Sequence, residues 1–562
     1  MAEPIGAFVL VLHSHLPYVL THNRLEEEWL FEAVAESYLP LLQVFTQLSA
    51  RHLSPKVTIG LTPVLLDQLA DPRFATAFLA YAEQKVHAAR EDQRLFTSRN
   101  DGHLARLAGL WAEFYRRTAA FFVEDVSSDM IGALRRLQKQ DAVELLTSAA
   151  THAYLPLLAL DSSVRAQIEI GTASYRQHFG AQPRGFWLPE CAYRPAGQWS
   201  PPFDDIAELQ TAERSALDQL LAAAGLQYFI ADARQLQDSA PDYARHSPCR
   251  LHWVDGRASS SAPVAVFIRD FETTARVWQH DGGYPGDPAY LEFHKKHGEG
   301  GLRYWRITDR RTELADKQPY RPEWALAQVR AHATHFARML RERLHGHWRQ
   351  TGERGIVVAA FDTELFGHWW FEGPQWIAEL LRQITTDGDV TLTTCQEYLQ
   401  QAPPLRTVQL TESSWGEGGD HRVWWQARTR QLWHDLYQAE CDMRRLMRQL
   451  QDKVGDQQVA RLVQQCGREL LLLQSSDWPF MISTGNTADH ARQRFALHSK
   501  NFQSCRAWAE RSLVGEPLSE EELRELEEME QQNAIFSKLD LSRFWLPLPA
   551  PRPLAPVLMT DY

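Results

Sequence analysis

Short apolar runs alternate with stretches of helical periodicity over roughly the first 400 residues of the chain. The apolar runs lie at 7–12, 56–61, 142–147, 184–189, 226–232, 263–268, 355–361 and 390–394. Nearly continuous apolar runs of this length are typical of strands buried on both faces of a parallel sheet. Stretches such as 30–48 and 322–344 carry apolar residues at helical spacing between them. This alternation predicts either a β/α barrel or a doubly wound sheet.

Polar residues at the ends of the runs favour the barrel. They are His13, His15, Thr62, Thr151, His152, Glu190, Asp232, Arg269, Asp270, Glu272, Asp362 and Glu364. Turns are polar in most proteins, so any one of these residues has an ordinary explanation. Polar ends on seven strands converge only if the strands close, and in a closed barrel the strand ends ring one mouth where a site is assembled. We therefore expect an α/β protein with a distorted seven-stranded parallel barrel.

The pattern changes after residue 400, where long helices are predicted. Helical periodicity covers 421–453, 457–478 and 486–513, and Ser519 with Glu522 forms a capping-box pattern at the start of an acidic helix. The expected division is a catalytic barrel over 1–400 with a helical insert at 196–225, an all-helical domain over 401–535, and a Pro-rich tail over 536–562.

Charge and composition narrow the function classes. The 562 residues carry a formal net charge of -12 without a basic block, which argues against nucleic-acid and anionic-membrane partners. Six cysteines lie far apart without a CxxC pair, so we expect reduced core thiols. The first residues lack the basic region of a signal peptide, and no run approaches a membrane span. These features predict a cytoplasmic protein; the oligomeric state stays open, with a monomer as the default.

Two carboxylates, Glu190 and Asp362, each follow a buried run and lie among aromatic residues. A pair of carboxyl groups facing each other across a sugar is the minimum equipment for glycoside chemistry. An ion pair of Glu190 with Arg184 or Arg194 is the ordinary alternative. Glu364, two residues beyond Asp362, is an equal candidate for the acid on pattern alone.

The aromatic content points toward a carbohydrate substrate. The chain has 19 Trp, several of them beside glycines and charged residues. These are Trp29, Trp278, Trp305, Trp369, Trp370, Trp415 and Trp424. Flat sugar faces stack on indole rings, although core packing is the commoner role of any single Trp.

The histidines offer a competing hypothesis. His13, His15 and His152, together with acids at strand ends, could hold a metal ion in a hydrolytic metalloenzyme or a deacetylase. The same side chains could hydrogen-bond a carboxylate or sugar hydroxyls instead. We expect no metal and no cofactor.

Five motifs, in order, resemble the signature regions of glycoside hydrolase family 57. They are HSHLPYV at 13, ATHAYLP at 150, GFWLPECAY at 185, FDTELFGHWWFEG at 361 and SSDWPFMISTG at 475. Within that family the chain is most similar to the 1,4-α-glucan branching enzymes. The likeness extends to about residue 510.

The resemblance implies a role for individual residues. Glu190 matches the family's nucleophile and Asp362 its acid/base, which leaves Glu364 in a supporting position. Residues matching substrate-binding positions are His13, His15, Trp29, His152, Arg269, Asp270, Trp278, Glu364, Trp370, Trp415, Trp424 and Asp477. Tyr243, in the segment 233–250, matches a tyrosine on a mobile loop over the site.

The implied activity is a retaining double displacement that cleaves an α-1,4-glucan and transfers the chain to a glucose O6, in glycogen biosynthesis. The alternatives are a 4-α-glucanotransferase, an α-amylase-like hydrolase on the same fold, and a non-catalytic glucan-binding protein.

Overall fold

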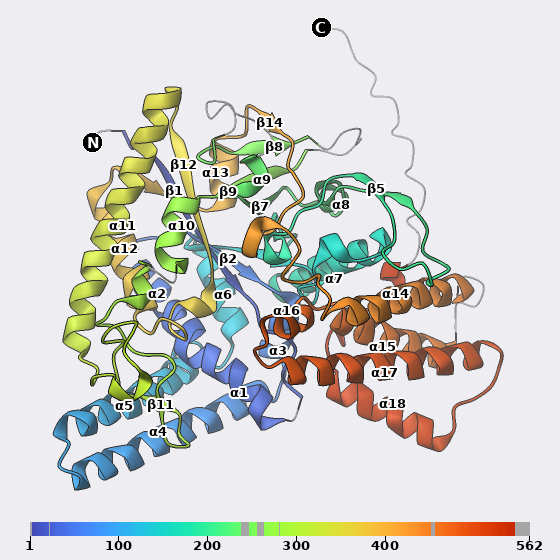
Figure 1. Cartoon of the computed structure of the whole chain (residues 1–562), viewed down its shortest axis with the longest axis horizontal. Coiled ribbons are helices and arrows are strands. Elements are labelled where there is room, and N and C mark those ends of the chain that lie inside the picture. Colours follow the sequence, from blue (N-terminus) through green and yellow to red (C-terminus); the bar gives the residue numbers. More distant parts are fainter. Residues whose placement is uncertain are drawn as a thin grey trace.

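The fold is described from a computed structural model of the chain, which describes residues 3–21, 23–237, 247–255, 263–279, 282–450 and 456–545 (Figure 1). Tyr243 and the end of the predicted tail lie outside the described residues. Within these ranges, no helix combines the length and the apolar character needed to cross a membrane.

Seven parallel strands close into the predicted barrel. In spatial order they are β12 (Gly355–Asp362), β1 (Gly6–Ser14), β2 (Val57–Leu61), β3 (Val143–Ser148), β4 (Gly185–Trp187), β7 (Tyr228–Asp232) and β9 (Ala265–Arg269). The ring closes where Arg269 of β9 pairs with Val358 of β12. The first seven apolar runs are therefore the barrel strands. The eighth forms β13 (Val390–Leu392), which pairs with β1 outside the ring.

Successive residues of each strand face opposite sides of the barrel wall. In β1, Val9 and Val11 belong to the core inside the barrel, whereas Phe8, Leu10 and Leu12 pack against the surrounding helices. Both sides are apolar, which explains why the runs in the sequence are continuous rather than alternating.

Helices surround the barrel (Figure 1). They are α1 (Arg24–Ala33), α2 (Leu39–Ala50), α3 (Pro63–Leu69), α4 (Phe74–Ser98), α5 (Gly102–Glu124), α6 (Met130–Lys139), α7 (Asp161–Phe179), α9 (Arg234–Gln237), α10 (Phe271–Trp278), α11 (Pro322–Thr351), α12 (Gly373–Asp387) and α13 (Cys395–Gln401). Two small strands, β8 (His252–Val254) and β14 (Thr407–Val408), extend the sheet beside β9. The hairpin of β10 (Lys296–His297) and β11 (Leu302–Arg303) lies between α10 and α11 in the sequence.

The insert at 196–225 is not the helical segment that we expected. It holds an antiparallel ribbon of β5 (Gly197–Trp199) and β6 (Ala212–Arg214), followed by one short helix, α8 (Leu217–Ala223). Pro201 and Pro202 follow the first strand and cannot donate hydrogen bonds to a helix, which accounts for the irregular chain there.

The C-terminal region is helical, as predicted, but its helices start at residue 430 rather than 421. They are α14 (Arg430–Leu450), α15 (Gln457–Leu473), α16 (Asp477–Thr484), α17 (Ala488–Leu513) and α18 (Glu520–Gln532). The Thr429 hydroxyl donates to the Trp424 carbonyl, holding the preceding residues in turns. The capping box of Ser519 and Glu522 is present.

The beginning of the predicted tail is part of the helical region. Leu541, Phe544 and Trp545 are buried, in a short helix η8 (Leu541–Trp545) that packs on α7 and α15. The apolar residues FW at the start of the Pro-rich stretch explain this docking, because they cover apolar surface that would otherwise face water.

The loop after β12 is held against a π-helical turn, η1 (Val34–Tyr38), which joins α1 to α2. Gly367 has a φ of 114° in this loop, and a Cβ atom there would lie 1.8 Å from the Glu36 carbonyl oxygen. Only glycine permits this approach, and the loop carries Glu364.

We therefore predict that Gly367→Ala lowers the free energy of unfolding by about 2 kcal/mol or more, through backbone strain and overpacking. The matched control is Gly180→Ala, which also has a positive φ, of 70°, but has no atom within 4 Å of an added Cβ. Calorimetric melting of the two variants tests this; an equal loss in both would show that the contact with Glu36 contributes nothing.

Candidate functional site

Glu190 stands in an unusual backbone conformation at the end of β4. Its φ is 61° and that of Cys191 is 47°, in the left-handed region that non-glycine residues rarely adopt. Two bonds from Trp415 hold Glu190: the Trp415 amide donates to the Glu190 carbonyl at 3.0 Å, and the indole Nε1 donates to Oε2 at 2.6 Å. Strained backbone held in this way is concentrated at functional sites.

Asp362 ends β12, directly opposite His13 of β1 in the parallel register. Two residues on, Glu364 accepts hydrogen bonds on Oε1 from the Tyr38 hydroxyl and from the His15 amide, the latter at 3.2 Å. The sequence pattern alone left Asp362 and Glu364 as equal candidates for the acid, and their contacts now distinguish them. Glu364 is held by two donors, as a supporting group would be.

Burial makes the carboxyl groups of this mouth weak acids. It raises the pKa of Glu190 to about 8, with a smaller contribution from the charge of Asp362 and with the Trp415 hydrogen bond opposing. Burial and then the charge of Glu364 raise the pKa of Asp362 to about 8. The charge of Asp362 thus acts on Glu190, so the two carboxyl groups belong to one electrostatic site.

The contacts of the two carboxyl groups differ in the protonation state that they favour. The Trp415 indole stabilises the ionised form of Glu190. Asp362, beside the Glu364 charge, is the less favourable place for a negative charge. These neighbours favour the anion at Glu190 and the proton at Asp362, which is the ordering of nucleophile and acid that retaining glycoside chemistry requires.

Three histidines form a stacked layer beside the carboxyl groups. The Nε2 atoms of His13 and His152 are 3.0 Å apart, and the rings of His15 and His152 stack with centroids 4.0 Å apart. His13 also stacks on Trp187 at 4.5 Å. Burial lowers the pKa of both His13 and His152, so these rings are neutral and can both donate and accept hydrogen bonds.

The helical region reaches this layer through Asp477, the first residue of α16. Its Oδ2 lies 3.0 Å from His15 Nε2, and Ser476 binds His152 Nδ1 at 2.9 Å. Burial acts to raise the pKa of Asp477, but His15 and the hydrogen bonds outweigh it and lower the pKa to about 2. The Asp477 carboxylate therefore stays ionised.

Arg269 lies on the other side of the carboxyl pair. It forms an ion pair with Asp232, and its guanidinium lies over the Trp415 ring at 5.3 Å from the centroid. Its positive charge lowers the pKa of Asp362 and so opposes the Glu364 charge. Trp278, which is 41% exposed, meets Trp415 edge-on with ring centroids 6.0 Å apart.

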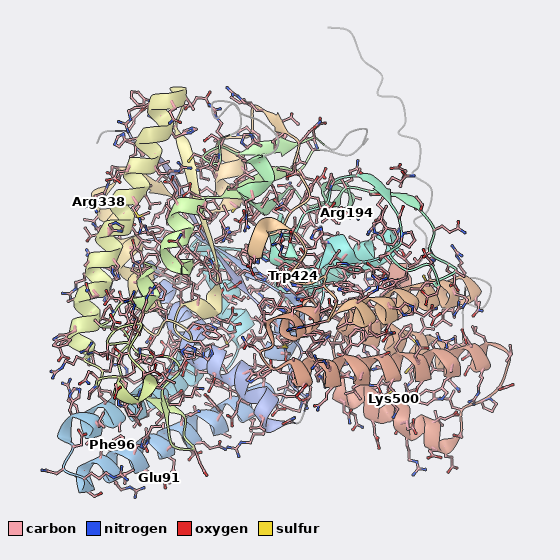
Figure 2. The ribbon with its side chains drawn as sticks, viewed as in Figure 1. Glu91, Phe96, Arg194, Arg338, Trp424 and Lys500 are labelled. Carbon is pink, nitrogen blue, oxygen red and sulfur yellow. The ribbon has the colours of Figure 1, made fainter. Side chains whose placement is uncertain are left out.

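Three of the predicted substrate contacts, Asp270, Trp370 and Trp424, pack against or bind other residues of the protein. Trp370 and Trp424 are each 1% exposed. Trp370 packs among Phe366 and Trp376, and Trp424, which is labelled in Figure 2, stacks on Tyr154. Asp270 is fully buried, caps α10 and binds Arg343 at 2.8 Å. In this structure all three side chains are engaged within the protein, in ring packing or in a helix cap and an ion pair. The aromatic motifs look alike in sequence whether the ring faces the core or the cleft.

Trp29 lies at the edge of this region. It is partly buried and meets His490 of α17 edge-on, at 5.1 Å between centroids. Its position between the barrel and the helical region leaves its predicted role as a chain contact open.

Two supporting residues were missed by sequence reasoning. Tyr38 reaches Glu364 from the π-helical turn η1, a kind of turn frequent at functional sites, but its motif AESY reads as ordinary helix. Arg234 donates from Nη2 to the Trp415 carbonyl at 2.9 Å and pairs with Asp232. Its position two residues after a strand-end acid was the available signal.

Within the described ranges, no three His, Cys, Asp or Glu side chains come together in an arrangement that could hold a metal ion. The histidine layer is engaged in ring stacking and in hydrogen bonds to Asp477, Ser476 and Thr62 instead.

Two family models match the chain. Residues 9–411 match the family model described as glycosyl hydrolase family 57. The chain belongs to this family. Residues 435–544 match a second model, described as 1,4-alpha-glucan branching enzyme, C-terminal.

Individual relatives cover almost the whole chain. The 1,4-alpha-glucan branching enzyme of Thermococcus kodakarensis is 37% identical over 542 residues, which are 94% of this chain and 77% of that protein. The crystal structure of the branching enzyme of Pyrococcus horikoshii matches with a TM-score of 0.88 at 35% identity, covering 98% of each chain. The α-amylase AmyC of Thermotoga maritima matches with a TM-score of 0.81 at 27% identity, covering 97% of this chain and all of that one.

The ionised Asp477 generates a stability prediction. Because its pKa is depressed, its contribution is present above the unfolded pKa near 4 and is lost as the pH falls toward 2. Asp477→Asn should lower the free energy of unfolding by about 2 kcal/mol at pH 7 and by the same amount at pH 5, with a smaller loss at pH 3.5.

Calorimetry at the three pH values measures this loss. Asp489→Asn, at a carboxylate 92% exposed on α17, is the control and should change little. A loss for Asp477→Asn that stays the same down to pH 3.5 would contradict the ion pair with His15.

Proposed function

We propose that this family 57 protein is a 1,4-α-glucan branching enzyme that works by a retaining double displacement. The observation that carries the proposal is the electrostatic pairing of Glu190 and Asp362 in one site, with Trp415 bonded to the first and Glu364 beside the second. The branching relatives that match over almost the whole length support it.

In the first step, the ionised Glu190 attacks the anomeric carbon of an α-1,4-linked glucose and forms a glycosyl ester. Asp362 gives its proton to the departing O4, so the rest of the chain leaves as an alcohol. In the second step, the O6 hydroxyl of an acceptor glucose loses its proton to Asp362 and attacks the same carbon. The Glu190 ester breaks, and an α-1,6 branch has formed with overall retention.

The surrounding residues are proposed to hold the sugar in which the bond is cleaved. His13, His15 and His152 are neutral or paired rings that can bond hydroxyls, and Asp477 orients His15. Arg269, over the Trp415 ring, opposes the accumulation of negative charge when both carboxyl groups ionise. Trp415 has two roles in this scheme, because it holds Glu190 and also forms a wall with Trp278.

Tyr243 is proposed to cover the bound chain and exclude water, on the resemblance alone. We further propose that the enzyme acts in the cytoplasm as a monomer on amylose or glycogen-like glucan. The six cysteines, all within the described ranges, are buried and form no disulfide bond, which fits a reducing compartment.

Hydrolysis is the second candidate, favoured by the match to an α-amylase over nearly the full chain. The two reactions share the first step and differ in whether water or a sugar hydroxyl breaks the ester.

Incubation with amylose separates them. We expect new α-1,6 linkages, counted by proton NMR or by debranching, with few new reducing ends. Reducing ends without α-1,6 linkages would overturn the branching assignment in favour of hydrolysis.

Glu190→Gln should lower kcat by about a thousandfold or more while glucan binding persists, because the amide keeps the shape but cannot form the ester.

The pH dependence tests the role given to Asp362. This group must be protonated when O4 leaves, so the rate falls as the pH rises through its pKa. The charge of Glu364 raises that pKa. Glu364→Gln should therefore move the alkaline limb of the kcat/KM profile to lower pH.

The control is Glu379→Gln, at a carboxylate on α12 that pairs with Arg382. It should leave the alkaline limb in place. An alkaline limb that is unmoved or moves upward in Glu364→Gln would exclude Glu364 as the group that keeps Asp362 protonated.

A further inference from the structure

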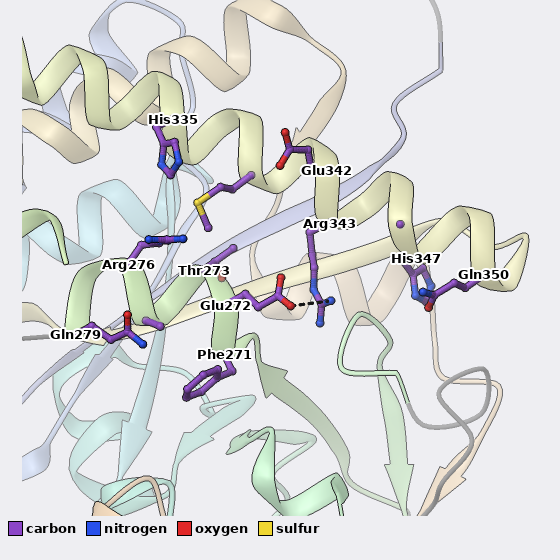
Figure 3. A pocket seen from close by; sticks show the side chains of 13 residues that line it. Phe271, Glu272, Thr273, Arg276, Gln279, His335, Glu342, Arg343, His347 and Gln350 are labelled. Atoms are coloured by element: carbon purple, nitrogen blue, oxygen red, sulfur yellow. Dashed lines mark ion pairs between the residues drawn. The ribbon is translucent and has the colours of Figure 1, made fainter. Parts of the chain in front are cut away.

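A groove of about 530 Å³ runs between α10 and α11 on the outside of the barrel (Figure 3). One wall is α10, which follows β9 and therefore begins next to Arg269 of the candidate site. The other wall is the second half of α11, the long helix before β12. No residue that lines the groove was predicted to bind substrate. Asp270 and Trp278, which were predicted to do so, are the sequence neighbours of the lining residues Phe271 and Gln279.

Two exposed aromatic residues lie on the same stripe of α10. Phe271, the first residue of the helix, is 55% exposed and lines the groove, and Trp278, the last, is 41% exposed. Residues seven apart lie on one face of a helix, here about 10 Å apart along its axis. The buried residues of α10 are Thr273, Thr274 and Val277. An exposed aromatic pair on one face is costly to leave in water unless something covers it.

This stripe is continuous with the candidate site. Trp278 meets Trp415 at 6.0 Å between ring centroids, and Trp415 binds the Glu190 carboxylate. Gln279, the next residue after Trp278, lines the groove. A chain leaving the site past Trp415 and Trp278 would therefore enter the groove and reach Phe271 about two helical turns away.

The charges of the groove favour a neutral occupant. Its lining holds two carboxylates, Glu272 and Glu342, and two guanidinium groups, Arg276 and Arg343. Glu272 lies 3.7 Å from Arg343, a pair drawn with a dashed line in Figure 3. A lining with balanced charge neither attracts nor repels a charged ligand. Its interspersed hydrogen-bond donors and acceptors suit a ligand rich in hydroxyl groups.

We propose that the groove between α10 and α11 is an outer glucan-binding site, in which Phe271 stacks on a sugar ring of a chain that also passes Trp278. This inference rests on the proposed function for the identity of the chain. The site would hold long glucans more tightly than short ones, because only a chain that extends beyond the carboxyl pair can occupy both places.

Affinity electrophoresis in gels containing amylose measures this binding without any need for catalysis. Phe271→Ala should raise the dissociation constant for amylose about fivefold, the effect expected for the loss of one aromatic contact. The matched control is Trp348→Ala, which removes an aromatic side chain 54% exposed on α11 that does not line the groove. It should migrate as the unaltered protein does.

A second variant blocks the groove without removing a contact. Gly346 lines the groove on α11, and an added Cβ there has no atom within 4 Å. Gly346→Trp should fill the groove while leaving the helix intact, and should weaken binding to amylose at least as much as Phe271→Ala. For both variants, we expect KM for amylose to rise by a larger factor than KM for maltoheptaose, and kcat to change less than either.

The outcomes separate this inference from the function. If branching is observed but both variants bind amylose as the unaltered protein does, the outer site is wrong and the function stands. If both variants lose affinity but no α-1,6 linkages form, the function fails and the site remains a glucan site. A change in oligomeric state on gel filtration for Gly346→Trp, with amylose binding unchanged, would show that the groove holds a second copy of the chain and would also overturn the proposal.

Discussion

The pairing of β9 with β12 closes the seven strands into a ring, and the candidate site depends on that closure. It places Arg269, at the end of one strand, near Asp362, at the end of the next. Without this pairing the sheet would have two free edges. Glu190, which follows β4, would then be separated from Asp362 by the three strands β3, β2 and β1. Closure brings carboxyl groups from distant parts of the sequence to one mouth, where few water molecules can stabilise their charges.

The second constraint is electrostatic. Two buried carboxyl groups cannot both ionise cheaply, so the site holds a proton at a pH where free acids hold none. The indole of Trp415 and the carboxylate of Glu364 act on opposite members of the pair, one favouring the anion at Glu190 and the other favouring the proton at Asp362. In the proposed mechanism, the division of roles between nucleophile and acid therefore comes from neighbours rather than from the carboxyl groups themselves.

The barrel and its polar mouth could be predicted from sequence because buried parallel strands leave continuous apolar runs, and polar residues after them mark one end of the ring. The histidine layer and Asp477 come from motifs that resemble those of the family, and the structure brings them together. The insert at 196–225 was mistaken for helix because its apolar residues also fit a ribbon that packs on α14, as Trp199 does against Tyr437.

The direction in which an aromatic ring faces was not accessible from sequence. Trp370 and Trp424 occur in motifs as polar as that of Trp278, yet they are enclosed by Trp376 and Tyr154 respectively. The role of Tyr38 was hidden for a related reason: a single π-helical turn turns its hydroxyl toward Glu364, and helical periodicity cannot report a turn of that kind.

In the proposed mechanism the Glu190 carboxylate forms a covalent bond to the sugar. A 5-fluoro-α-glucosyl fluoride, which slows the breakdown of a glycosyl ester more than its formation, can trap that bond. Digestion and mass spectrometry of the treated protein then identify the modified residue. This mechanism predicts one added glycosyl group on the peptide that contains Glu190. Asp362→Asn protein that is washed after a brief treatment can lack the group without changing that assignment. A label on Asp362, Glu364 or Asp477 instead of Glu190 would contradict it.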